Sequence, residues 1–277
     1  MFQRLVFPVS RYMLSYTVFG SSPEFAPYLH RSTTAGGGRS VEDMDDSELR
    51  VEPSPKRVRA YLAGRLVADT RRASLVWEIP WYPAYYIPAD DVTASLTPAE
   101  EADLYNVEVA GAVALAAARR FPESEQRRGL VRLEWGAMSH WLEEDEPVYT
   151  HPRDPHKRVD ILTSSRHVRI EAGGVTLAES SRPSILFETG LPPRYYLPLP
   201  DVRTELLTPS DTVSHCPYKG TAAYWSLVSG DGKNIAWTYR SPLPESQKVA
   251  GLVCFYDEKT DVYLDGELQE RPRTHFA

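Results

Sequence analysis

Short apolar runs and alternating apolar and polar positions recur along most of the chain, which is the pattern of antiparallel strands joined by tight turns. The segment VRAYLAGRLVAD at 58–69 alternates on both sides of a Gly turn, and VRIEAGGVTLAE at 168–179 repeats the pattern. Two further alternating runs, within 222–240, flank the turn sequence Gly230-Asp231-Gly232. These patterns predict hairpins and a mainly β protein.

One local signal favours a helix instead. Thr97, Pro98 and Glu100 form a helix-start pattern, with a capping residue, a proline at the first position and an acidic residue at the third. The residues that follow, LYNVEV, alternate again. We therefore expect at most a short turn of helix at this place.

The chain contains an internal repeat. Residues 58–96 align with 168–206 without a gap, and fourteen of these 39 positions are identical. The identical pairs include Glu78/Glu188, Tyr85/Tyr195, Tyr86/Tyr196 and Asp91/Asp201. Such self-similarity predicts two copies of one domain.

The alignment resumes at 122–131 against 244–253, so the second copy carries twelve additional residues in between. The string Trp141-Leu142-Glu143 then aligns with Tyr263-Leu264-Asp265. We expect a first repeat at 57–150 and a second at 167–277, each of ordinary domain size, with a linker at 151–166.

The N-terminal residues 1–50 differ in composition from the rest. The run at 32–40 is rich in Ser, Thr and Gly, as in linkers, and Met44 opens a sequence typical of the start of a compact cytosolic protein. We expect a disordered N-terminal extension at 1–50, with 1–43 outside any core or outside the natural protein.

Composition narrows the function classes. The net charge of −7 disfavours a nucleic-acid binder, and the chain lacks the ~20 consecutive apolar residues of a membrane-spanning helix. The two cysteines, Cys216 and Cys254, exclude a disulfide framework and a four-Cys zinc site. We expect a cytoplasmic protein without a metal or cofactor, and the sequence gives no indication of its oligomeric state.

Several longer strings resemble a known family. They are EEDEPVYTHPRDPHKRVDIL, SSRHVRI, LFETGLPPRYYLPLPDVRTELL and HCPYKGTAAYWSL, and together they look like the tandem form of the domain of unknown function 427, over 55–277. The resemblance implies two tandem β-tent-like antiparallel domains, each with two small sheets set at an angle, as in methionine sulfoxide reductase B and the thalidomide-binding domain of cereblon. Many β-tent relatives carry paired Cys-x-x-Cys zinc ligands, which this chain lacks.

The most distinctive motif is HCPYKG at 215–220, which only the second copy contains. The ammonium group of Lys219 could stabilise a Cys216 thiolate as a nucleophile, or it could hold an anionic ligand or form an adduct. Alternatively, the motif is structural, with Cys216 as a small buried residue and Lys219 paired with Glu188 or Asp201.

Tyrosines and tryptophans offer a second candidate site. Glu188, Tyr195 and Tyr196 recur in the first copy, which favours a structural role, although Tyr rings also line pockets for planar ligands. Trp225 and Trp237 lie on the two strands of one predicted hairpin. They are either core residues, as cross-strand aromatic residues often are, or the wall of a pocket.

Three functions remain open. The first is binding of a small polar or planar molecule, in a pocket of the second repeat or at the repeat interface, through Tyr195, Tyr196, Cys216, Tyr218, Lys219 and Trp225. The second is an enzyme acting on a small metabolite or nucleotide, with Cys216 or Lys219 reactive and Glu188 or Asp201 as the acid or base. The third is a protein-interaction scaffold. Of these, we favour the first.

Overall fold

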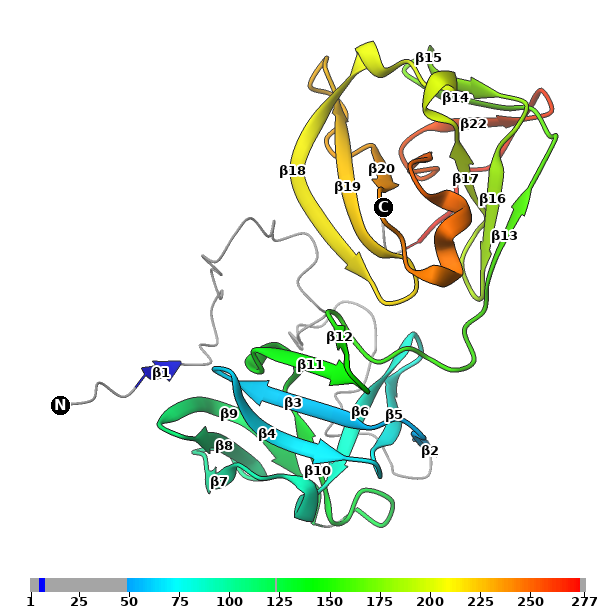
Figure 1. The fold of residues 1–277 in the computed structure, drawn as a ribbon. Coiled ribbons are helices and arrows are strands. Elements are labelled where there is room, and N and C mark those ends of the chain that lie inside the picture. Colours follow the sequence, from blue (N-terminus) through cyan, green and yellow to red (C-terminus); the bar gives the residue numbers. More distant parts are fainter. Residues whose placement is uncertain (1–4, 8–48, 123, 275–277) are drawn as a thin grey trace. The chain divides into compact units, whose positions relative to one another are not determined.

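The computed structural model describes residues 5–7, 49–122 and 124–274, which form two compact units with a boundary between Asp154 and Pro155 (Figure 1). We call residues 49–154 the first repeat and residues 155–274 the second repeat. Each contains one large and one small antiparallel sheet, so the protein is mainly β, as predicted.

The large sheet of the first repeat has the strand order β2-β5-β6-β10-β9-β8-β7. Its strands are β2 (Arg50–Pro53), β5 (Ser74–Ile79), β6 (Tyr82–Pro88), β7 (Ser95–Pro98), β8 (Leu104–Val109), β9 (Ala112–Arg120) and β10 (Leu130–Leu133). The small sheet has the order β12-β11-β3-β4. Its strands are β3 (Val58–Leu62), β4 (Arg65–Thr70), β11 (His140–Glu143) and β12 (Glu146–Val148).

The second repeat has a large sheet with the order β13-β16-β17-β21-β20-β19-β18. Its strands are β13 (Val159–Thr163), β16 (Ser184–Glu188), β17 (Arg194–Leu197), β18 (Leu207–Cys216), β19 (Gly220–Leu227), β20 (Ala236–Tyr239) and β21 (Val253–Phe255). Its small sheet, of order β15-β14-β22-β23, contains β14 (Val168–Ala172), β15 (Val175–Ser180), β22 (Asp261–Leu264) and β23 (Glu267–Leu268).

The two repeats therefore have the same strand order in both sheets, as expected of two copies of one domain. Strand register identifies equivalent residues, because Tyr86 lies opposite Arg132 and Tyr196 lies opposite Cys254. Arg132 and Cys254 thus occupy the same place in the two repeats, and their offset of 122 equals that of the sequence alignment at 122–131.

One part of the sequence alignment is wrong by one residue. Trp141 lies opposite Ala60 and Val262 lies opposite Ile170, so Trp141 is equivalent to Val262 rather than to Tyr263. Trp141 and Val262 are both buried. The alignment matched aromatic with aromatic, whereas the buried face of the strand sets the register.

Each repeat begins with a strand that the sequence analysis did not assign to it. β2 begins at Arg50 and pairs with β5, and the equivalent β13 lies within the predicted linker 151–166 and pairs with β16. Both are edge strands with little alternation. Of the predicted N-terminal extension, Leu5–Phe7 forms β1, which pairs in parallel with the start of β9, and Leu49 is buried. The remainder of that prediction lies outside the described residues.

The helix-start pattern at Thr97 and Pro98 does not form a helix. Both residues lie in β7, opposite Asn106 and Tyr105 of β8. Pro98 is tolerated because β7 is the edge strand of its sheet. Sheet pairing therefore overrides the local capping preference.

Each repeat has a main core between its two sheets. We call the other side of each large sheet, which faces away from the small sheet, its outer face. In the first repeat the cluster on this face is small and centred on Tyr86, whereas in the second repeat it is larger and rich in aromatic residues. The short 3-10 helix η7 (Pro244–Val249) contributes Val249 to the outer face of the second repeat, and Figure 1 shows η7 between the β18–β19 hairpin and β13.

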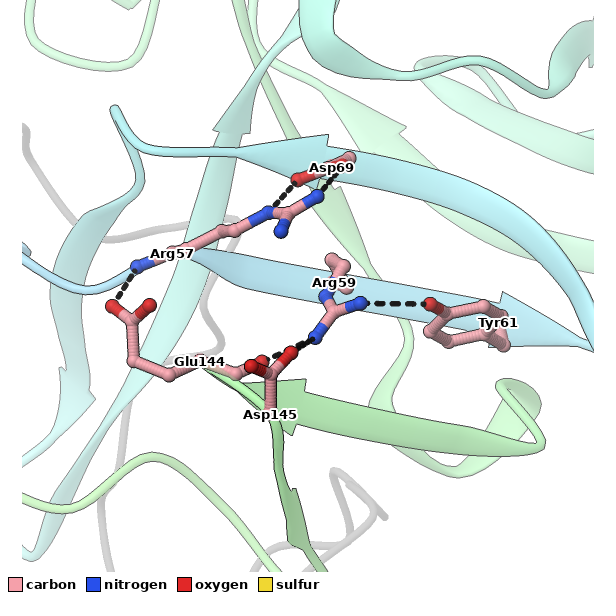
Figure 2. Close-up of polar contacts among 6 residues, drawn as sticks. All are labelled: Arg57, Arg59, Tyr61, Asp69, Glu144 and Asp145. Atoms are coloured by element: carbon pink, nitrogen blue, oxygen red, sulfur yellow. Dashed lines mark hydrogen bonds and ion pairs between the residues drawn. The ribbon is translucent and has the colours of Figure 1, made fainter.

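A polar network joins β4 to the β11–β12 turn across the start of β3 in the first repeat (Figure 2). Arg57 donates two hydrogen bonds to the carboxylate of Asp69, and its backbone N–H donates to the carboxylate of Glu144. The second repeat reproduces both contacts with different residues, because His167 contacts Glu179 and its backbone N–H donates to Asp265. This network is therefore part of the common fold rather than a site specific to one repeat.

Candidate binding site

The HCPYKG motif forms the tip of the β18–β19 hairpin, where Cys216 pairs with Gly220. This hairpin is longer than its counterpart β7–β8, and its additional length carries the motif. Gly220 has a φ of +94°, which favours glycine and allows the tight turn. The segment leading into η7 holds the turn: the backbone N–H of Leu243 donates to the carbonyl of Lys219, and the Ser246 hydroxyl donates to the carbonyl of Tyr218.

The turn places the ammonium group of Lys219 against the carboxylate of Glu188, at the end of β16. Both side chains are buried, with 12% and 8% of their surface exposed. Burial by itself lowers the pKa of Lys219, but Cys216 and Glu188 beside it outweigh that effect and raise the pKa above its ordinary value. Lys219 is therefore a buried cation, and the contact that the sequence analysis gave as the structural alternative is the one that forms.

The first repeat contains the same carboxylate with a different cation. Glu78, equivalent to Glu188, accepts hydrogen bonds from Arg132 of β10 at 2.6 Å and from the hydroxyl of Tyr86 at 2.7 Å. In the second repeat Cys254 replaces that arginine, and the cation comes from the hairpin tip instead. Lys219 is thus the partner of Glu188 in the second repeat.

Aromatic residues surround this ion pair on the outer face. The indole N–H of Trp237 donates to the hydroxyl of Tyr196 at 3.1 Å, and both residues are buried. Cys216 packs against the same cluster. Burial raises the pKa of Tyr196 and of Tyr239 well above the ordinary value, so both phenols stay neutral at physiological pH. We call its aromatic members the aromatic cluster: Tyr196, Tyr224, Trp237, Tyr239 and Tyr256.

Two of the predicted ligand-binding residues lie on the opposite face of the sheet. Tyr195 and Trp225 pack against the core between the two sheets, whereas their chain neighbours Tyr196 and Tyr224 belong to the outer face. Successive residues of a strand point to opposite sides, so the outer face brings together Tyr196, Cys216 and Lys219 with Glu188 but not Tyr195 or Trp225. Tyr218 lies in the same turn, half-buried.

Asp201, the other predicted acid or base, has a structural environment. Its carboxylate accepts hydrogen bonds from Ser180 and Arg182, and the bond from Arg182 is the largest reason why its pKa lies below the ordinary value. Asp91 has the same arrangement with Thr70 and Arg72 in the first repeat. A contact made identically in both repeats belongs to the common fold.

The sequence analysis missed a polar cluster at the other end of the outer face. Arg194, Asp257 and Glu258 are buried there, and Arg194 lies over the ring of Trp237. Arg194 stands beside Tyr195 in the sequence, whereas Asp257 and Glu258 lie in a charged stretch that gives no signal of a site.

The described residues contain no group of three or more His, Cys, Asp or Glu side chains suited to a metal ion. Nor does the described part of the chain include a helix long and apolar enough to cross a membrane. A hollow of about 220 Å³ lies in the first repeat, beside the β8–β9 turn, and none of the predicted site residues lines it.

Comparison with known families agrees with this architecture. A family model described as "Domain of unknown function (DUF427)" matches residues 50–106 and 160–266, which is more than half of the chain and includes parts of both repeats. Its two segments start at β2 and within β13, the first strands of the two repeats. A search of curated proteins finds no match.

Proposed function

The chain belongs to the family of the domain of unknown function 427, and we propose that its second repeat binds a small planar anion through Lys219. The observation that carries the proposal is the source of this cation. The first repeat pairs the equivalent glutamate with an arginine of its own sheet, whereas the second repeat uses a lysine from a hairpin extension that the common fold does not need.

A bound carboxylate would join Glu188 as a second partner of Lys219. An ammonium group is a compact point charge with three donors on a flexible stem, so it can hold a second carboxylate while Glu188 stays paired. Cys216 is only partly buried, which leaves the hairpin tip as the route of approach. The planar part of the ligand would then lie against the aromatic cluster, where Tyr and Trp rings offer both apolar faces and polar tips.

The alternative is an enzyme in which Cys216 acts as a nucleophile. One observation favours it, because the side chain of Cys216 interacts with the ammonium group of Lys219, an arrangement found around reactive thiols. Its acid or base would be Glu188, since Asp201 is bound to Ser180 and Arg182. The rate at which iodoacetamide alkylates Cys216 separates the two functions. Alkylation of Cys216 faster than that of a free thiol would favour catalysis, whereas alkylation well below that rate argues against it.

The proposal is tested by thermal-shift titration with nicotinate, and with nicotinamide as an uncharged probe of the same planar shape. A molecule that binds only the folded protein raises Tm. We expect nicotinate, but not nicotinamide, to raise the Tm of the wild-type protein.

Matched double variants locate the effect. Lys219→Met with Glu188→Gln removes both charges of the pair together and should abolish the shift. Arg132→Met with Glu78→Gln removes the equivalent pair in the first repeat, together with the contact of Arg132 to Glu134, and should leave the shift intact. A shift that survives the first variant, or one lost with the second, would contradict the proposal.

A further inference from the structure

The second repeat contains a buried cluster in which one guanidinium serves two carboxylates. Arg194 donates to both oxygens of Glu258, at 2.8 and 2.6 Å, and its Nη1 lies 3.7 Å from Asp257. The side chains of Arg194 and Asp257 are each 9% exposed and that of Glu258 is fully buried. With both carboxylates ionised, the cluster carries one negative charge more than its cation balances, and a buried carboxylate is costly unless it is paired.

This cluster is specific to the second repeat. Arg194 lies opposite Leu186 in the sheet, and the equivalent residue of the first repeat, opposite Val76, is Ala84. A device absent from one copy is not required by the common fold.

The cluster also holds the C-terminal segment. The hydroxyl of Thr274 donates to Glu258, and the guanidinium of Arg271 contacts Asp261 at 2.7 Å. Thr274 thus ties the C-terminal segment directly to the carboxylate of Glu258.

The charge of the cluster depends on Asp257. Among the described residues, the charged and titratable groups that interact with Asp257 are Arg194, Glu258, Tyr195 and Cys254, and Arg194 is the cation of this set. Burial is the main reason why the pKa of Asp257 is raised to about 7, and the neighbouring Glu258 adds to it. Proton release from Asp257 leaves two carboxylates competing for one guanidinium.

We propose that Asp257, Glu258 and Arg194 form a proton-controlled latch for the C-terminal segment 271–274. With Asp257 protonated, Arg194 is committed to Glu258 and the segment stays docked through Thr274. With Asp257 ionised, the two adjacent carboxylates repel each other and favour the hydrated, open form of the cluster. The latch is closed below neutral pH and loosens above it.

Amide hydrogen exchange of the full chain tests the latch, with protection factors for 268–274 corrected for intrinsic exchange at pH 6 and pH 8. The ionised fraction of a group with a pKa of about 7 rises roughly tenfold over this interval. Protection of the segment should therefore fall by up to about tenfold in the wild-type protein. Equal protection at both pH values would overturn the proposal by itself.

Two variants separate the latch from a general loosening. Asp257→Asn is neutral at every pH and should keep high protection at both values. Asp261→Asn, which removes only the tie to Arg271, should lower protection at both values and keep the pH dependence. Retained pH dependence in Asp257→Asn would also overturn the latch.

Discussion

Lys219 and Arg132 serve the same carboxylate position in the two repeats from different parts of the fold. Arg132 reaches Glu78 from the adjacent strand β10, whereas Lys219 reaches Glu188 from the tip of the β18–β19 hairpin. Because Cys254 occupies the place of Arg132 in the second repeat, the positive charge comes from the hairpin rather than from the adjacent strand of the sheet. The carboxylate thus belongs to the common fold, and its cation distinguishes the second repeat.

The first prediction concerns the cost of removing each cation. Lys219→Met leaves Glu188 buried without its ammonium partner and should destabilise the protein by about 3–5 kcal/mol. Arg132→Met should cost less, about 1.5–3 kcal/mol, because the Tyr86 hydroxyl still donates to Glu78 and because Glu134, the other partner of Arg132, is partly exposed. Urea unfolding measures both, and equal or reversed costs would show that the two pairs are not related as described.

The second prediction uses two adjacent tyrosines on opposite faces of β17. Tyr196→Phe removes the acceptor of the buried Trp237 indole N–H and should cost about 1–3 kcal/mol. Tyr195→Phe should cost less, since its ring remains in the core between the sheets. Urea unfolding of the two variants tests this order, and a larger loss for Tyr195→Phe would contradict the assignment of faces.

The third prediction concerns pH and stability. The pKa of Asp257 is about 7 in the folded protein and 3.8 in its ordinary state, so the folded protein holds this proton more tightly between those values. Stability should therefore fall as pH rises from about 4 to 7, by up to roughly 4 kcal/mol from this group. The lowered pKa values of Asp69, Asp91 and Asp201 act at lower pH. Burial lowers the pKa of His215, which adds an opposite contribution, a rise in stability, over the same interval. Urea unfolding at pH 5.5 and 7.5 should show the decline in the wild-type protein, whereas Asp257→Asn should lose the decline.

The fourth prediction treats Asp201 as structural. Asp201→Asn and Asp91→Asn weaken the same contact in the two repeats, so their Tm values should fall by similar small amounts. Neither variant should alter the nicotinate shift. Loss of the nicotinate-induced Tm shift in Asp201→Asn alone would instead show that Asp201 belongs to the binding site.

Much of the architecture could be predicted from the sequence. Alternation identified most hairpins, and the repeat identified two similar β domains. The edge strands β2 and β13 were not predicted. The sequence of β13, VDILT, alternates little, and the strand is recognised only by its pairing with β16. The register of the repeat alignment at Trp141 was also predicted wrongly, because residue similarity does not reveal which side of a strand is buried.

The candidate site was predictable only in part. The asymmetry between the copies singled out Lys219 and Cys216, and Glu188 was considered as the partner of Lys219. Strand parity could have separated Tyr195 from Tyr196, since neighbouring residues of a strand face opposite ways. No sequence pattern predicts the contact between Arg194 and Glu258, because the two residues are 64 positions apart and the contact has no counterpart in the first repeat.

The most direct test of the proposed binding site is a ¹H–¹⁵N spectrum of the tryptophan indole groups during titration with nicotinate. The chain has six tryptophans, and Trp237 and Trp225 lie on opposite faces of the same sheet. Binding at Lys219 should shift the Trp237 indole signal and leave that of Trp225 in place, and the Lys219→Met, Glu188→Gln double variant should show no shift. A titration that moves Trp225 or the tryptophans of the first repeat while Trp237 stays fixed would contradict the proposed binding site.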